Sequence, residues 1–165
     1  MIYIGIDPGC SGAIAAITGR GNLVDVTRFS EASIEGRIAV MISEFVERLD
    51  TDDICITIER VHSMPKQGVS TTFTFGRAYG EAVGAAVLRG CPVQFVTPQK
   101  WQRDLALLSH KGEAKIDHKR RMQQHASLRW SHRVLRDEAD AMLLAEWARL
   151  KGDHAGRLID IQIGD

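Results

Sequence analysis

Four acidic residues stand where a metal site would need them. Asp7 and Glu59 each end a short segment in which isoleucine alternates with other residues, and Asp137 and Asp140 open a long apolar segment. Carboxylates are costly to bury unless their charge is compensated. A divalent cation held by convergent oxygens provides that compensation, and Mg²⁺ prefers carboxylate ligands. The sequence therefore predicts a metal site built from these four acids.

The chemistry that such a site favours is hydrolysis of a phosphodiester bond. This reaction needs an activated water and neutralised charge on the phosphate, which two divalent ions about 4 Å apart supply together. Two of the acids also have plainer interpretations, because Asp7 could cap a turn and Asp137 could be the N-cap of its helix. Glu59 has no obvious capping role at the end of a strand, so it is the most informative of the four.

The elements that must position these acids follow from hydrophobic periodicity. We expect strands over residues 2–7, 13–18, 22–29, 54–59 and 93–96, and helices over 34–49, 71–89, from 97 onward, 113–125 and 137–150. This order predicts a mixed α/β sheet with helices on both faces. If the strands that end at Asp7 and Glu59 are parallel neighbours, both carboxylates emerge at one edge of the sheet. Asp137 and Asp140 are three residues apart and share one helix face.

Composition sets the broad class of the protein. The 165 residues are 44% hydrophobic and 25% charged, which suits one globular domain with its own core. We expect that domain to cover residues 1–150, with a tail of unknown role at 151–165. No apolar run is long enough for a membrane span, and the three cysteines fit free thiols in a reducing compartment. We therefore expect a cytoplasmic protein with no membrane partner.

Positive charge is concentrated in one segment of a chain whose net charge is zero. Residues 100–136 hold ten lysine and arginine residues against three acidic ones. A basic surface of this kind is typical of contact with a phosphate backbone. A solvated helical surface is the plainer alternative.

Six segments, in family order, resemble the RuvC-type Holliday junction resolvases, in particular the short phage and prophage members. They are Ile4–Ala13, Ile58–His62, Met64–Ser70, Phe73–Arg77, Val96–Trp101 and Asp137–Ala141. The resemblance implies an RNase H-like fold, in which the first three strands are antiparallel and the later strands parallel. It also implies a homodimer that nicks branched DNA at four-way junctions with Mg²⁺ or Mn²⁺, and no small-molecule cofactor.

The same resemblance implies roles for single residues. Asp7, Glu59, Asp137 and Asp140 match the catalytic, metal-binding acids of the family, and Lys115 matches a basic residue near the scissile phosphate. Residues implied as DNA contacts are Met64, Lys66, Phe73, Lys100, Lys111, Lys115 and Lys119, of which Lys100 is a weaker match. Met64 and Phe73 are candidates for the apolar side chain that family members insert into the junction, although a core position suits Phe73 better.

A stripe of glycines, Gly76, Gly80 and Gly84, recurs at every fourth residue of an expected helix. Glycine costs roughly 1 kcal/mol of helix propensity at each position. Close helix packing, inside the fold or across a dimer, would offset that cost. Two other functions stay open: a less structure-specific nuclease that cuts flaps or hybrids, and a non-catalytic junction-binding protein. Four acids facing a polyanion argue against a simple binder.

Overall fold

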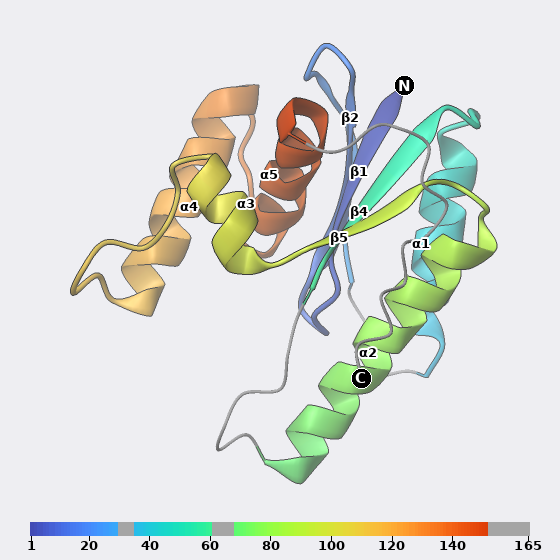
Figure 1. Ribbon diagram of the computed structural model, residues 1–165, viewed down its shortest axis with the longest axis horizontal. Helices are drawn as coiled ribbons and strands as arrows, with labels where there is room; N and C mark the ends of the chain where they lie inside the picture. Colours follow the sequence, from blue (N-terminus) through green and yellow to red (C-terminus); the bar gives the residue numbers. More distant parts are fainter. Residues whose placement is uncertain (30–34, 61–67, 152–165) are drawn as a thin grey trace.

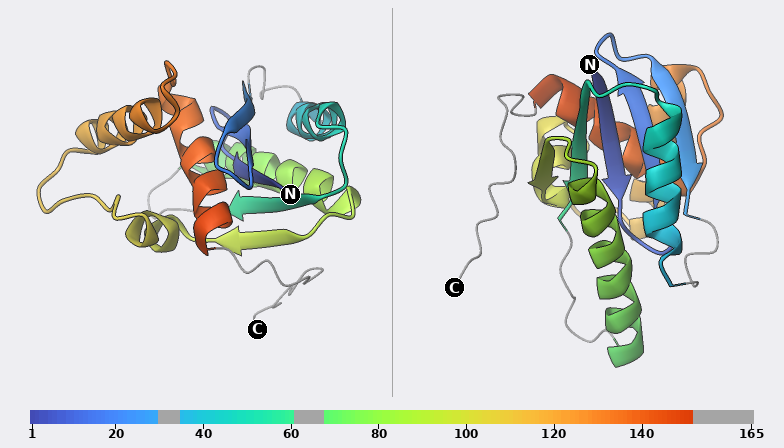
Figure 2. Two further views of the ribbon diagram at one scale, coloured as in Figure 1. Left: turned by 90° about the horizontal axis from the view of Figure 1, so that it is seen from above. Right: turned by 90° about the vertical axis from the view of Figure 1, so that its right-hand side faces the viewer.

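The computed structural model describes residues 1–29, 35–60 and 68–151, and these form a sheet with helices on both faces (Figure 1). One helix pair, α1 and α2, covers one face, and α5 covers the other face, flanked by α3 and α4 (Figures 1 and 2). The elements in chain order are β1 (Ile2–Asp7), β2 (Ala13–Thr18), β3 (Leu23–Arg28), α1 (Arg37–Arg48), β4 (Ile54–Glu59), α2 (Val69–Leu88), β5 (Val93–Val96), α3 (Pro98–Asp104), α4 (Lys115–Trp130) and α5 (Arg136–Lys151).

The five strands lie in the order β3-β2-β1-β4-β5. β1 pairs antiparallel with β2 and parallel with β4, and β5 continues the parallel half of the sheet. Ile6 of β1 is opposite Ile58 of β4, so the next residues, Asp7 and Glu59, leave the sheet side by side at one edge. The predicted mixed sheet, with three antiparallel strands followed by parallel ones, is confirmed.

The alternation within β1 and β4 separates two apolar layers. Ile4 and Ile6 face the layer that α1 and α2 complete, whereas Tyr3 and Cys55 belong to the layer built on α5. Asp7 and Glu59 have the same phase as Tyr3 and Cys55 in their strands, so they lie on the α5 side of the sheet. The alternation that predicted these strands therefore also decides which helix the acids meet.

Close packing of α5 on β1 depends on Gly5. A Cβ added to Gly5 would lie 2.2 Å from the carbonyl oxygen of Ala141 and 2.5 Å from the backbone nitrogen of Ala145. Both distances are far below van der Waals contact, so a larger residue would push the helix off the sheet. Because α5 carries Asp140 in its first turns, this contact sets the height of that carboxylate above β1.

A carboxylate of α2 fixes the start of α1. Glu81 accepts hydrogen bonds from the backbone N–H groups of Gly36 (3.0 Å) and Ile38 (3.1 Å), and it pairs with Arg77 at 3.3 Å. The α1 N-cap residue, Gly36, supplies no side-chain cap of its own. Glu81 therefore satisfies two of the free donors at this helix start and joins α1 to α2.

Some boundaries differ from the sequence prediction. α2 begins at Val69 rather than residue 71, and α4 continues to Trp130, five residues past its predicted end. Among the described helices, none has the length and apolar character needed to cross a bilayer. The predicted tail falls almost entirely in residues 152–165, outside the described part of the chain.

Candidate functional site

Three carboxylates from three elements converge at the carboxyl edge of β1 and β4. Asp7 ends β1, Glu59 ends β4, and Asp140 comes from the second turn of α5. The negative charges of the neighbouring acids raise the pKa of both Asp7 and Glu59. The parallel pairing of the strands and the contact of α5 with Gly5 together explain this convergence.

Asp7 holds its proton more tightly than an exposed aspartate. Burial is the main cause, and the negative charge of Asp140 adds to it, so that the pKa of Asp7 rises to about 6. The Lys119 ammonium and the Gly9 N–H, which donates to Asp7 Oδ1 over 3.2 Å, work in the opposite direction. The turn interpretation of Asp7 is therefore also satisfied, because its carboxylate does bond the turn that follows β1.

Glu59 is affected more strongly still. Burial first, and then the charge of Asp7, raise the pKa of Glu59 to about 8. Its Oε1 accepts a hydrogen bond from the indole N–H of Trp101 over 2.8 Å, and that bond partly lowers the pKa. Trp101 is fully buried in α3, a helix that Thr97 caps through its side chain. Trp101 was not among the site residues predicted from the sequence.

Asp140 is more deeply buried than Asp137, the other predicted metal ligand on α5. Its side chain is 9% exposed and forms an ion pair with Lys119 through Oδ2. Its second oxygen, Oδ1, is buried and has no hydrogen-bond partner among the described residues. A buried carboxylate oxygen without a donor is rare in proteins, and a divalent cation is the partner that such an oxygen suits. The donor set at this edge therefore fits a hard cation such as Mg²⁺.

Asp137 lies at the rim of the acid cluster. It is partly exposed and faces Arg28 at 3.9 Å, while its charge contributes a small upward effect on the pKa of Asp7. The N-cap interpretation of Asp137 was wrong, because α5 begins at Arg136 and Asp137 already belongs to its first turn. Glu138 supplies the cap instead, by accepting a hydrogen bond from the Leu135 N–H over 2.8 Å.

The four acids are close but are not arranged as a ready coordination shell. In residues 1–29, 35–60 and 68–151 no three acidic, histidine or cysteine side chains are grouped closely enough to hold an ion. Each carboxylate already has a partner in the protein. The Gly9 N–H and the Trp101 indole N–H donate hydrogen bonds to Asp7 and Glu59, and Asp140 and Asp137 form ion pairs with Lys119 and Arg28.

Lys119 is the lysine that enters the acid cluster. The family resemblance implied that Lys115 is the basic residue near the reacting phosphate and that Lys119 is only a DNA contact. Lys115 is the first residue of α4 and is exposed, and no ion pair joins it to another described residue. The spacing of four residues, which puts both lysines on one helix face, was the only signal in the sequence that Lys119 could share this place.

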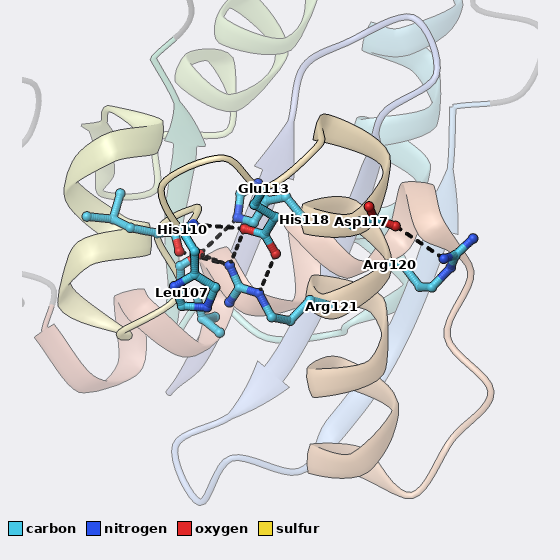
Figure 3. A network of polar contacts seen from close by, with 8 residues as sticks. Leu107, His110, Glu113, Asp117, His118, Arg120 and Arg121 are labelled. Carbon is cyan, nitrogen blue, oxygen red and sulfur yellow. Dashed lines mark hydrogen bonds and ion pairs between the residues drawn. The ribbon is translucent and has the colours of Figure 1, made fainter.

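Much of the positive charge of the basic segment is neutralised inside the subunit (Figure 3). Arg121 pairs with Glu113 at 2.9 Å and donates to the carbonyl oxygen of Leu108 at 2.8 Å. A ring nitrogen of His118 lies 2.9 Å from the carbonyl oxygen of Leu107. These bonds fasten the loop before α4 to that helix. Arg121 therefore holds the loop against α4. The positive surface that is free to bind DNA is smaller than the ten basic residues of the segment indicated.

Two further lysines of the predicted DNA surface, Lys100 and Lys111, differ in whether an acidic residue neutralises their charge. Lys100 forms an ion pair with Asp104 at 3.0 Å and lies over the ring of Trp147. Lys111 is exposed in the loop before α4, next to Gly112, whose φ of 82° is one that side chains rarely adopt. Lys111 and Lys115 are thus the lysines of this set whose charge has no acidic partner among the described residues.

Phe73 is not a core residue, contrary to the sequence prediction. It is 72% exposed, and Val69, one turn earlier in α2, is more exposed still. The N-terminal half of α2 extends beyond the end of the sheet (Figure 1). Met64 and Lys66, the other DNA-contact candidates of this region, lie outside the described residues.

A cleft of about 410 Å³ separates the turn after Asp7 from the start of α2. Backbone and small polar side chains line most of it: Gly9, Cys10, Ser11, Ser70, Thr71, Thr74 and Phe75. The cleft begins two residues after Asp7, at Gly9, and none of the four acids lines it.

The glycine stripe of α2 is not used for close packing inside the subunit. A Cβ added to Gly76, Gly80 or Gly84 would meet no described atom within 4 Å. A groove of about 540 Å³ runs beside Gly80 and Gly84, between α1 and α2. Val40 and Leu88, two apolar residues that line this groove, are largely exposed.

Solved structures of RuvC from Thermus thermophilus resemble this chain. One has a TM-score of 0.63 and 21% sequence identity, and the match covers 89% of this chain and 92% of that one. Another, T. thermophilus RuvC in complex with a Holliday junction substrate, has a TM-score of 0.65 and 20% identity, with 92% and 98% covered. No family model and no curated protein matches the sequence. The chain therefore has the RNase H-like α/β fold of RuvC.

Proposed function

We propose that the protein is a metal-dependent endonuclease that nicks branched DNA, with the four-way junction as its substrate. The observation that carries this proposal is the convergence of Asp7, Glu59 and Asp140 at one sheet edge, with Asp140 Oδ1 buried and unpaired. Three acids facing a polyanion would weaken a protein that only binds DNA. The shared fold with a protein whose structure contains a Holliday junction supports the choice of branched DNA.

Mg²⁺ is the proposed metal, and Mn²⁺ would substitute for it. Asp7, Glu59 and Asp140 would hold it, with Asp137 at the rim. Two such ions, when bound, activate water and stabilise the leaving oxygen of a phosphodiester. The protein's own contribution is to keep these carboxylates on rigid elements and out of bulk water, which raises the pKa of Asp7 and Glu59. Cation binding near neutral pH would therefore release a proton mainly from Glu59.

The DNA backbone would lie across the acid cluster between α4 and α2. Lys111 and Lys115 would contact phosphates on the α4 side, and Lys100 and Lys119 would add charge near the acids. The cleft between the turn after Asp7 and the start of α2 would admit the strand toward α2. These contacts supply the electrostatic part of affinity, which does not depend on sequence.

The exposed end of α2 would serve recognition of the branch point. Phe73 and Val69 are apolar and largely uncovered, an arrangement that is unfavourable in water unless a partner covers it. An aromatic side chain can stack on an unpaired or unstacked base at a junction. Met64 and Lys66 stay proposed DNA contacts of the same region.

The proposed active unit is a homodimer. The groove between α1 and α2, with Val40, Leu88 and the uncovered glycines beside it, offers an apolar surface on the face opposite α5. Glycines allow two helices to approach closely, so a second copy of α2 is the occupant that this surface fits. A twofold dimer would bring two equivalent sites to the two equivalent strands of a four-way junction.

The test is a cleavage assay in Mg²⁺ with labelled four-way junction, flap, duplex and RNA–DNA hybrid. Nicks confined to the junction are expected, paired on opposite strands. Asp7→Asn should abolish nicking and keep or strengthen binding, because it removes a charge that repels phosphate. Preferred cutting of flaps or hybrids would favour the less specific nuclease. Wild-type nicking by Asp7→Asn would remove the metal-site assignment.

A further inference from the structure

The acid cluster contains a cation of its own. Lys119 reaches from α4 to Asp140 on α5, and its ammonium contacts Asp140 Oδ2. Its charge also acts on Asp7 and Glu59, since it lowers the pKa of both. One ammonium therefore interacts with all three of the carboxylates that would hold a metal ion.

The placement of Lys119 is specific rather than a surface pairing. The two partners come from different helices, and Asp140 is 9% exposed. The Lys119 ammonium, like that of lysine in general, is charged at neutral pH. The Lys119 side chain is 35% exposed and the Asp140 side chain 9%, so the pair is partly shielded from water. Hydrogen bonds between charged groups are among the stronger ones in proteins, and removal of the ammonium from Asp140 therefore has a cost.

Metal ligation at Asp140 conflicts with this pair. A divalent cation placed among Asp7, Glu59 and Asp140 would repel an ammonium in contact with the same carboxylate. Asp140 Oδ1, which is buried and has no hydrogen-bond partner in the described part of the chain, could accept a cation, whereas Oδ2 already contacts Lys119. Full use of the carboxylate by a metal thus requires Lys119 to withdraw.

From this geometry we infer that Lys119 competes with the metal ion for Asp140 and so sets how readily the site loads. The inference rests on the proposed metal site and goes beyond it, because it assigns to one residue of this chain control over metal entry. Lys115 and Lys119 share a face of α4, so a withdrawn Lys119 lies on the same side as an exposed lysine. A DNA phosphate there would attract the freed ammonium, and DNA and metal would then favour each other's binding.

The test measures metal binding without DNA and without turnover. The full chain, stripped of metal with EDTA and exchanged into buffer, is titrated with Mn²⁺ while free Mn²⁺ is followed by electron paramagnetic resonance. Lys119→Met, which keeps the length of the side chain but not its charge, should bind Mn²⁺ about tenfold more tightly than the wild type, as expected for loss of one charged hydrogen bond. Lys119→Gln should shift in the same direction.

Lys115→Met is the matched control. It removes the same charge one turn earlier on the same helix, where no acid of the cluster is contacted, so its Mn²⁺ affinity should change less than about twofold. Circular dichroism melts verify that each variant is folded. If Lys119→Met does not fold, Lys119→Gln takes its place in the comparison. Equal Mn²⁺ affinity of the wild type and the folded Lys119 variant, or an equal gain in Lys115→Met, would overturn the inference.

Failure of the inference is distinguishable from failure of the proposed function. If the wild type binds Mn²⁺ and nicks junctions but Lys119→Met binds Mn²⁺ no better, only the competition is wrong. If neither the wild type nor the Lys119 variants bind Mn²⁺ and no substrate is cut, the metal site itself is wrong, and the inference falls with it. Tight Mn²⁺ binding by Lys119→Met beside weak binding by the wild type supports the competition whatever the substrate.

Discussion

The indole N–H of Trp101 donates a hydrogen bond to Glu59 Oε1 over 2.8 Å, which joins the core to the acid cluster. Trp101 is fully buried, so it has little freedom to follow the carboxylate. The bond holds Glu59 in one place and lowers its pKa against the effect of burial. A core residue thereby favours the ionised form of Glu59, a metal-site candidate, against the larger effect of burial.

Trp101→Phe should therefore shift the pH dependence of nicking. Phenylalanine removes the donor, so the pKa of Glu59 rises further above about 8 and the acid limb of kcat/KM at fixed Mg²⁺ moves to higher pH. Trp147→Phe is the matched control, because the Trp147 indole N–H donates to Asp104 over 2.8 Å, a carboxylate that is not one of the four acids. A profile that moves equally in both variants would contradict a specific role for Trp101.

Metal affinity should rise with pH until Glu59 is ionised. Below about 8, where Glu59 holds a proton, the apparent Mg²⁺ affinity should fall by about tenfold for each pH unit, because the cation must displace that proton. Titration calorimetry in buffers of different ionisation enthalpy measures the protons released. Glu59→Gln should abolish the release near pH 8, and a release unchanged in that variant would assign the proton elsewhere.

Stability without metal should change in the opposite direction. Both Asp7 and Glu59 have folded-state pKa values above their ordinary ones, so their contribution to stability is present at low pH and is lost as pH rises through about 6 and about 8. In EDTA the Tm should therefore be lower at pH 9 than at pH 6. Glu59→Gln should flatten this dependence, and a Tm that climbs with pH would contradict the assigned direction of the shifts.

The elements that position the site were largely predictable from the sequence. Alternation of isoleucines in β1 and β4 gives both the strands and the face on which Asp7 and Glu59 lie, because the period of a strand is two. The packing of α5 on Gly5 was not predictable, since it depends on the distance between a helix and a sheet. The choice between Lys115 and Lys119 was also out of reach, because both lie on one face of α4 and only the meeting of α4 with α5 decides between them.

Exposure of Phe73 was missed for a related reason. An aromatic residue in an expected helix is normally a core residue, and only the overhang of α2 beyond the sheet leaves it uncovered. The pairing of charges in the basic segment was also not predictable, because Glu113 is eight residues from Arg121 in the sequence and yet forms an ion pair with it. Charge counts along a chain do not reveal which charges pair in space.

Gly5→Val should destabilise the fold and misplace Asp140. Its Cβ would approach the carbonyl oxygen of Ala141 at 2.2 Å, and backbone atoms cannot rotate away, so α5 must shift. We expect a loss of about 3 kcal/mol or more in urea unfolding, at the upper end of overpacking effects. Gly19→Ala is the control, since its Cβ would meet the nearest atom at an ordinary 3.6 Å. Equal stability of the two variants would contradict the close contact.

The dimer proposal predicts different effects for two equally exposed leucines. Leu88 lines the groove between α1 and α2 and is 87% exposed, and Leu128 on α4 is 82% exposed. Leu88→Glu should place a charge in the dimer surface and yield folded monomers of about 18.3 kDa by light scattering. Leu128→Glu should leave twice that mass, as in the wild type. A monomeric wild type, free and bound to a junction, would rule the dimer out.

Binding of DNA through Lys111 and Lys115 should be visible in its salt dependence. Each phosphate contact contributes about 0.9 to the slope of log K against log salt, so replacing both lysines by alanine should flatten the slope by about two units.

Arg20→Ala with Arg48→Ala is the matched control, because it also removes two positive charges. Arg20 lies in the β2–β3 turn, at the end of the sheet opposite Asp7, and Arg48 of α1 pairs with Asp25 on β3, the edge strand two places from β1. Fluorescence anisotropy of a labelled junction in EDTA, between 50 and 200 mM salt, is the measurement. A slope unchanged by the lysine pair, or flattened equally by the arginine pair, would place the DNA surface elsewhere, since only charges within reach of the phosphates release counterions on binding.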